Sequence, residues 1–143
     1  IIIPCYNDNN ELIGIRTRNV KDGSMRSKLE EIFDSEEVDR IYLNFSDPWT
    51  RQNKPKRRLT YRAFLEQYKA LMHEGSSICF KTDNDELFDF SVEEFKECGF
   101  ELSEYTRDLH NSEWDADNVR TEFEQKFADQ GINIKRVVAT NRK

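Results

Sequence analysis

The sequence has few of the residues that build disulfides, metal sites or phosphate loops. Its three cysteines form no CxxC pair and leave an odd count, so we interpret them as reduced, partly buried thiols. The two histidines, His73 and His110, lie near no cysteine, and we expect no bound metal. Within residues 1–40 the only glycines are Gly14 and Gly23, too few for a glycine-rich loop between a first strand and a first helix.

Long apolar runs are also absent. No run approaches the ~20 residues that a membrane span needs, and the opening IIIPCYNDNN lacks the basic flank of a signal peptide. We therefore expect a cytoplasmic protein with no membrane contact. The 143 residues fit one domain, and the ten Phe, five Tyr and two Trp supply enough apolar surface for a folded core.

A strand, a helix and a second strand are predicted in the middle of the chain. The apolar run at 41–45 is typical of a parallel strand buried on both faces. Apolar residues at helical spacing from 61 to 72 follow, with Thr60 as the expected N-cap and Gly75 as the stop, and 77–81 is the next strand. A crossover of this length makes the strands parallel neighbours.

The remaining elements predict an α/β fold. We expect two short strands within 1–15, a short helix at 29–34, a helix at 87–98 and a strand at 100–105. Ser91 and Glu94, at capping-box spacing, predict a break in the 87–98 helix, and Gly99 should end it. After a polar loop at 106–118 come a helix at 122–129, ended by Gly131, and a final strand at 132–139, antiparallel at a sheet edge.

Two acidic residues follow the two central strands. Asp47 precedes Pro48, which stops the first strand, and Asp83 lies in the polar turn after the second. In open α/β sheets ligands bind outside the carboxyl ends of the strands. We therefore expect Asp47 and Asp83 at the same edge, facing one crevice.

Basic residues are concentrated in one place. The segment 51–62 contains six of them and no acidic residue, although the formal net charge is −6. Between Asp83 and Glu124, by contrast, acidic residues predominate. This distribution predicts a phosphate-bearing partner at the basic segment, although a solvated loop is the alternative interpretation.

Three motifs give the sequence a resemblance to a known family. NFSDPW followed by KRRL, then FKTDN, then TEFE, resemble the bacterial tRNA (guanine-N7-)-methyltransferases in order and interval, over about residues 38–137. The resemblance implies a Rossmann-like class I methyltransferase fold with a mostly parallel sheet. It also implies S-adenosylmethionine as methyl donor, tRNA as partner, and N7 of the guanosine at tRNA position 46 as acceptor.

The resemblance also assigns roles to residues. Asp47 matches the catalytic aspartate, which borders the donor pocket, and Asp22 resembles the acidic residue near the donor's adenine. The residues implied to bind substrate are Arg51, Asp83, Thr121, Glu122, Phe123 and Glu124. We expect the tRNA phosphates to contact Lys54, Lys56, Arg57 and Arg58.

The N-terminal part departs from the family pattern. No segment resembles the glycine-rich ExGxGxG loop that holds the donor, so we interpret 1–37 as a poorly matched remnant of the donor-binding half and 38–143 as the catalytic and tRNA-binding half of one domain. Either the sequence omits regions or the chain is an inactive tRNA-binding module that has lost the donor site. The intact substrate motifs favour omission.

Some of these residues also have purely structural interpretations. Asp47 before Pro48 is typical of a turn, and Thr121 with Glu124 fits a capping box.

Overall fold

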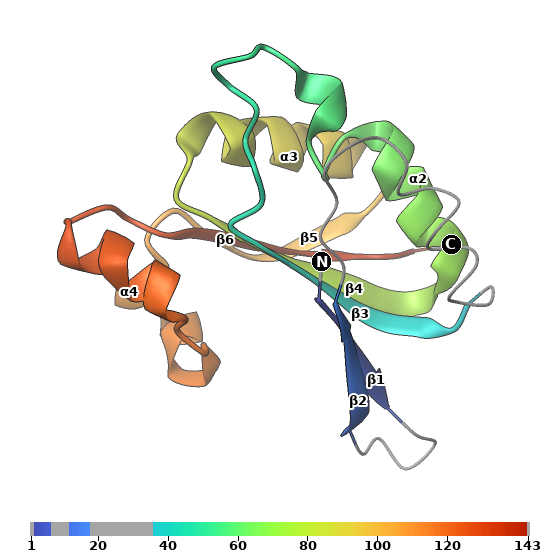
Figure 1. Cartoon of the computed structure of the whole chain (residues 1–143). Coiled ribbons are helices and arrows are strands. Elements are labelled where there is room, and N and C mark those ends of the chain that lie inside the picture. The colour runs from blue at the N-terminus through green and yellow to red at the C-terminus, as the bar shows by residue number, and fades with distance from the viewer. Residues whose placement is uncertain (1, 7–11, 18–35, 143) are drawn as a thin grey trace.

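The structure, a computed structural model, describes residues 2–6, 12–17 and 36–142, with side chains over 36–142. The helix expected at 29–34 and the predicted donor contact Asp22 lie outside these residues. Six strands form one sheet in the order β2-β1-β3-β4-β6-β5 (Figure 1). They are β1 (Ile2–Tyr6), β2 (Leu12–Thr17), β3 (Val38–Asn44), β4 (Met72–Thr82), β5 (Glu101–Thr106) and β6 (Lys135–Thr140).

The sheet is mixed, so the expectation of a mostly parallel sheet is corrected. β3 and β4 pair in parallel, as the crossover predicted. The other described pairings, β1 with β2 and with β3, and β6 with β4 and with β5, are antiparallel. Because β6 runs antiparallel to both β4 and β5, the strands β3, β4 and β5 share one direction. The final strand is antiparallel as expected, but it lies inside the sheet, and β5 occupies the edge.

Helices α2 (Arg62–Leu71) and α3 (Asp85–Glu97) cover one face of the sheet (Figure 1). The buried core lies between them and the strands, and Phe80 on β4 stacks on Phe88 of α3 with ring centroids 6.3 Å apart. Alternate residues of β3, Ile41 and Leu43, are buried in this core. Tyr42, between them, is only half-buried. The prediction that β3 is buried on both faces is therefore wrong.

Three predicted helix signals are wrong because tertiary contacts use the residues differently. Thr60 is no cap: its hydroxyl lies 2.6 Å from the hydroxyl of Ser91, and both side chains are buried. Ser91 does not break α3, which is continuous and is capped by Asn84, whose side chain accepts from the backbone N–H of Leu87. Gly75 lies within β4, which begins directly after α2.

Glu94 of α3 caps the N-terminus of α2. Its carboxylate accepts from the backbone N–H of Arg62 at 2.7 Å and from the Arg62 guanidinium at 2.9 Å. The first turn of α2 is therefore satisfied by a side chain of α3 rather than by a local cap.

The C-terminal half follows the sequence more closely. Gly99 and Gly131 follow the C-cap residues of α3 and α4 (Glu122–Asp129) and have positive φ angles of 81° and 76°, as helix stops do. The loop at 106–118 contains two short 3-10 helices, η2 (Leu109–Asn111) and η3 (Glu113–Asp117). In the part of the chain that the structure describes, no helix is long and apolar enough to cross a membrane. The cytoplasmic location stays a prediction.

Candidate functional site

Asp47 and Asp83 follow the carboxyl ends of two adjacent parallel strands, as the sequence predicted. β3 ends at Asn44 and β4 at Thr82, and the backbone N–H of Phe45 still donates to the carbonyl of Lys81 at 2.9 Å. Asp83 is half-buried, and its carbonyl accepts from Nζ of Lys135 at 2.9 Å. The turns that carry the two aspartates therefore begin side by side at one edge of the sheet.

Asp47 lies in a tight turn. Phe45 and Trp49, on either side of it, have positive φ angles of 54° and 52°, a conformation that costs energy in residues other than glycine. The Asp47 carboxylate is exposed and accepts from the backbone N–H of Trp49 at 3.2 Å. The Asp-Pro turn interpretation is therefore correct, and the carboxylate keeps acceptor positions that face solvent.

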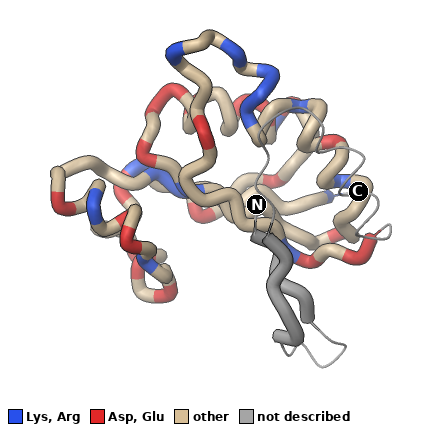
Figure 2. Tube along the Cα trace, in the orientation of Figure 1, with Lys and Arg blue, Asp and Glu red and all other residues tan. Residues whose placement is uncertain are grey.

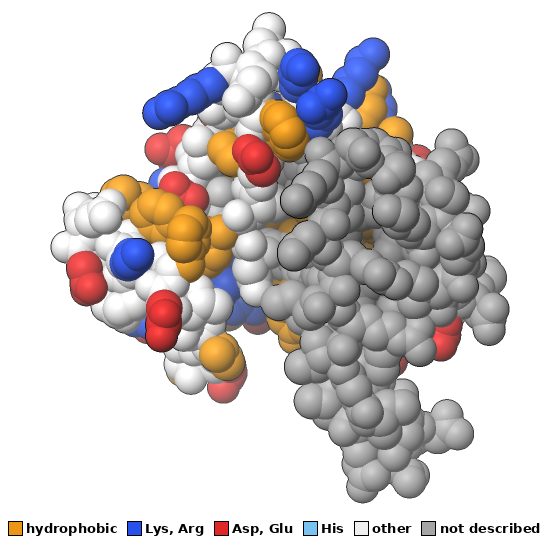
Figure 3. All heavy atoms as spheres, viewed as in Figure 1, with side chains coloured by type: hydrophobic (Ala, Val, Ile, Leu, Met, Phe, Trp, Pro, Cys, Tyr) orange, Lys and Arg blue, Asp and Glu red, His pale blue; other side chains and the backbone are white. Residues whose placement is uncertain are grey.

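The basic loop, which we define as residues 51–58, rises beyond this turn and includes the short helix η1 (Pro55–Arg57) (Figure 1). Figure 2 shows the Lys and Arg positions of this loop along the backbone at the top of the molecule, and Figure 3 shows basic side chains gathered there. Arg51, Lys54, Lys56 and Arg57 are exposed, and the Arg57 guanidinium lies 5.2 Å from the centroid of the Trp49 ring. These four side chains form a cationic surface beside Asp47.

Arg58 differs from its neighbours. Only 4% of the residue is exposed, and its guanidinium donates to the carbonyl of Pro48 and to Glu86 of α3. This guanidinium is therefore turned into the protein, and the phosphate contact expected at Arg58 stays a prediction that its burial disfavours.

The segment Thr121–Glu124 begins α4. Thr121 is the N-cap, and its hydroxyl oxygen accepts from the backbone N–H of Glu124 at 3.1 Å, so half of the predicted capping box is present. Thr121 and Glu122 are exposed. Phe123 is 53% exposed and packs edge-on against Phe45, with ring centroids 5.5 Å apart. This contact brings the start of α4 to the end of β3.

Glu124 turns inward instead of returning to the cap. It is fully buried, and its Oε1 lies 3.0 Å from Nζ of Lys81 on β4. Its Oε2 accepts from the Asn118 amide at 3.1 Å and lies 3.4 Å from Nε2 of His110. Glu124 thus fixes α4 to the sheet, and a contact between this carboxylate and substrate stays a prediction.

Sequence reasoning missed Lys81 and Lys135. Lys81 also donates to Asn118 and to the carbonyl of Val119, and it thereby orders the segment before α4. Lys135 joins the turn at Asp83 to Asp85 of α3, with Nζ 3.1 Å from the carboxylate. For Lys81 the signal was a lysine directly after the apolar residues 78–80 of the predicted strand, because a charge that a strand buries needs a partner.

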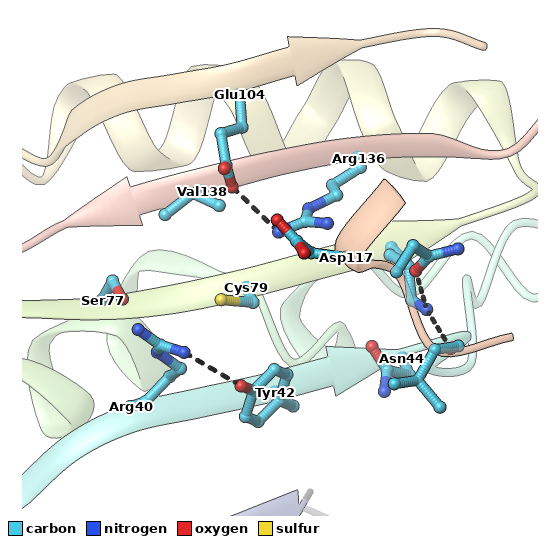
Figure 4. Close-up of a pocket in the computed structure, with 12 residues that line it drawn as sticks. Arg40, Tyr42, Asn44, Ser77, Cys79, Glu104, Asp117, Arg136 and Val138 are labelled. Carbon is cyan, nitrogen blue, oxygen red and sulfur yellow. Dashed lines mark hydrogen bonds and ion pairs between the residues drawn. The ribbon is translucent and has the colours of Figure 1, made fainter. Parts of the chain in front are cut away.

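A pocket of about 350 Å³ lies on the sheet face opposite α2 and α3. Figure 4 shows polar side chains on both sides of it, with Arg136 paired to Glu104 at 2.8 Å and Arg40 donating to the Tyr42 hydroxyl. Cys79 also lines the pocket, and burial raises the pKa of its thiol, so a nucleophilic thiolate is disfavoured there. Cys79 and Cys98 are free and buried, as expected.

Over residues 2–6, 12–17 and 36–142, no group of three or more His, Cys, Asp or Glu side chains is placed to hold a metal ion. The expected absence of a metal stays a prediction.

Comparison with known proteins identifies similar chains. The model of the family described as "Putative methyltransferase" matches residues 9–137. A protein of Clostridium acetobutylicum named tRNA (guanine-N(7)-)-methyltransferase is 42% identical over 138 residues, which cover 90% of this chain and 65% of the relative. Proteins with the same name from Brevibacillus brevis and Streptococcus sanguinis are 46% and 49% identical over 80% and 79% of this chain. The chain spans 53% of the length of each of these two relatives.

Proposed function

The chain belongs to the methyltransferase family whose model matches it over residues 9–137, and from this premise we propose that it methylates N7 of guanine in tRNA, at position 46. The methyl donor is S-adenosylmethionine. One observation carries the proposal: the three motifs of the resemblance meet at the carboxyl edge of β3 and β4, joined by the contact of Phe123 with Phe45 and the pair of Lys81 with Glu124. The name of the similar proteins supports the same reaction.

The chemistry needs positioning more than proton transfer. N7 of guanine carries a lone pair and no proton, so the methyl group can be transferred in line without a general base. Most of the acceleration then comes from orientation and electrostatic stabilisation. The exposed Asp47 carboxylate stabilises the positive charge that develops on the purine.

Asp83 and the start of α4 hold the base. Guanine offers N1–H and an exocyclic amine on its Watson–Crick edge, and carboxylates accept from both. The half-buried Asp83 and the exposed Thr121 and Glu122 provide acceptors at this edge of the sheet, and Phe123 presents an aromatic surface beside them. A nucleotide turned out of the tRNA variable loop fits such a site because its edge is free.

Asp47 lies at the place where we expect the methyl donor to bind. S-adenosylmethionine supplies an electrophilic methyl group when it is bound. Of the two residues expected to hold it, Asp47 is exposed with acceptor positions facing solvent, which fits hydrogen-bond donors of a bound ligand.

The basic loop supplies the phosphate contacts. Arg51, Lys54, Lys56 and Arg57 are exposed and lie beyond the Asp47 turn, so a tRNA backbone held by them brings its bases to the sheet edge. Such contacts carry affinity and orientation rather than base recognition.

The substitution Asp47→Ala tests this proposal. Methyl transfer to unmodified tRNA should fall by at least about 100-fold, because a charge-stabilising group is lost, while tRNA affinity stays within about threefold. Transfer of labelled methyl from S-adenosylmethionine and filter binding measure the two quantities, with Asp129→Ala at the far end of α4 as the matched control. Undiminished turnover of the Asp47 variant would remove Asp47 from the mechanism. If calorimetry shows no binding of S-adenosylmethionine to the wild-type protein, the enzymatic proposal itself fails.

A further inference from the structure

Arg58 is the buried member of the basic loop. Its neighbours Lys56 and Arg57 are exposed, whereas the Arg58 side chain is 5% exposed. A buried guanidinium needs partners for its charge and its donors, and these partners show what the residue does.

The contacts of Arg58 join three parts of the fold. Nε donates to the carbonyl of Pro48 at 2.7 Å, and Nη2 donates to Glu86 of α3 at 3.1 Å. The guanidinium also stacks on Phe90, with Cζ 4.6 Å from the ring centroid. Arg58 therefore ties the turn at Asp47 to the first half of α3.

The turn that Arg58 holds is one that local preferences oppose. Trp49 adopts a positive φ directly after Pro48, and such a conformation persists only where surrounding contacts fix it. The planar, rigid guanidinium of Arg58 donates from one nitrogen to the Pro48 carbonyl and from another to Glu86. This pair of hydrogen bonds fixes the position of the carbonyl. A lysine has no such fork, and its single nitrogen cannot take the places of both Nε and Nη2.

We propose that Arg58 is a positioning residue, which fixes the Pro48 carbonyl and thereby the direction of the Asp47 carboxylate, and that it does not contact tRNA phosphate. The role of Asp47 rests on the proposed function, whereas the hold on the turn does not. Phosphate binding by the loop is left to its exposed side chains.

Two variants with opposite expected effects test the proposal. In Arg58→Lys, amide exchange at Trp49, Asn53 and Lys54, whose N–H groups bond within this turn, should accelerate about tenfold or more. The kcat of methyl transfer should fall by about 10- to 100-fold with KM for tRNA nearly unchanged, because the carboxylate is misplaced. Arg58→Met removes the charge, and in this variant the slope of log affinity against log salt should not change, because the buried guanidinium releases no counterion from tRNA.

Lys56→Ala is the matched control, one exposed charge in the same loop. It should leave amide exchange in the turn unchanged and reduce the salt slope by about 0.7 to 0.9, the effect of one phosphate contact. Glu86→Gln weakens the contact between Arg58 and α3 without changing the loop sequence. It should accelerate amide exchange in the turn, but by less than Arg58→Lys does.

The outcomes separate the two claims. A salt slope that falls in Arg58→Met as it does in Lys56→Ala, with exchange in the turn unchanged in Arg58→Lys, would overturn the positioning role. If the wild-type protein neither binds nor methylates tRNA, the proposed function fails, while the exchange measurement still decides whether Arg58 holds the turn.

Discussion

Lys81 and Glu124 form an ion pair in the protein interior. Only 9% of the Lys81 side chain and none of the Glu124 side chain is exposed, and the ion pair joins β4 to α4. Among the described residues, no group other than the Lys81 ammonium is placed to pair with Oε1 of Glu124, so the charge of Lys81 is its main stabilisation. Removing either partner would leave the other charge buried and uncompensated.

Substitution of this pair should therefore be strongly non-additive. We expect Lys81→Met or Glu124→Leu alone to lower the free energy of unfolding by about 3 to 5 kcal/mol, and the double variant to be more stable than either single one. Urea denaturation measures all three. The surface pair of Lys96 with Glu93, 58% and 70% exposed, is the control, and Lys96→Met should change stability by less than about 1 kcal/mol. Additive effects of the two substitutions would show that the pair is not coupled.

At the scale of the elements, an ion pair also joins the first residues of β3 and β4. His73 Nε2 contacts the Asp39 carboxylate, and Nδ1 lies 2.8 Å from the carbonyl of Glu74. The hydrogen bond to Asp39 raises the pKa of His73 above its ordinary value of 6.5, with further contributions from the Glu74 carbonyl and the nearby Glu36. The protonated imidazole is therefore favoured in the folded protein.

The resulting pH dependence has a definite sign. Because the folded pKa is raised, the stabilisation is fully present below the unfolded pKa of about 6.5 and is lost as pH rises through the folded pKa. The stability difference between the wild type and His73→Gln should thus be larger at about pH 5.5 than at about pH 8.5, although below about 1 kcal/mol because both side chains are half-exposed. Thermal denaturation at the two pH values measures it. A difference that grows with pH would contradict the assignment.

The elements also show what the sequence could predict. Periodicity and glycine stops located β3, α3 and α4, because these signals are local, and the crossover placed Asp47 beside Asp83. The caps at Thr60 and Ser91 were mispredicted, since their hydroxyls bond each other between the segment before α2 and helix α3. The burial of Arg58 and Glu124 was missed for the same reason: a basic run or a capping box does not show which side chain finds a distant partner.

At the scale of the whole molecule, the charge is divided between two regions. The protein carries a formal net charge of −6, yet the loop at its top is cationic (Figure 2). Acidic side chains near the loop are partly paired, as Glu86 is with Arg58 and Asp89 is with Arg107. A polyanion approaching this protein is therefore repelled by its net charge and attracted at the basic loop, which favours one docking orientation.

Removing the exposed charges of the basic loop should weaken the salt dependence of tRNA binding. The triple variant Lys54→Ala, Lys56→Ala and Arg57→Ala should reduce the slope of log affinity for tRNA against log salt by about 2 to 3. Three phosphate contacts are lost, so fewer counterions are released when tRNA binds. Titrations between about 50 and 200 mM salt measure the slope. A variant with Lys96→Ala and Arg142→Ala, two basic residues outside the loop that pair with Glu93 and Glu101, should keep the wild-type slope. If the slope falls in both variants in proportion to the charges removed, three and two, tRNA responds to net charge alone, and the loop makes no preferred contact with the RNA backbone.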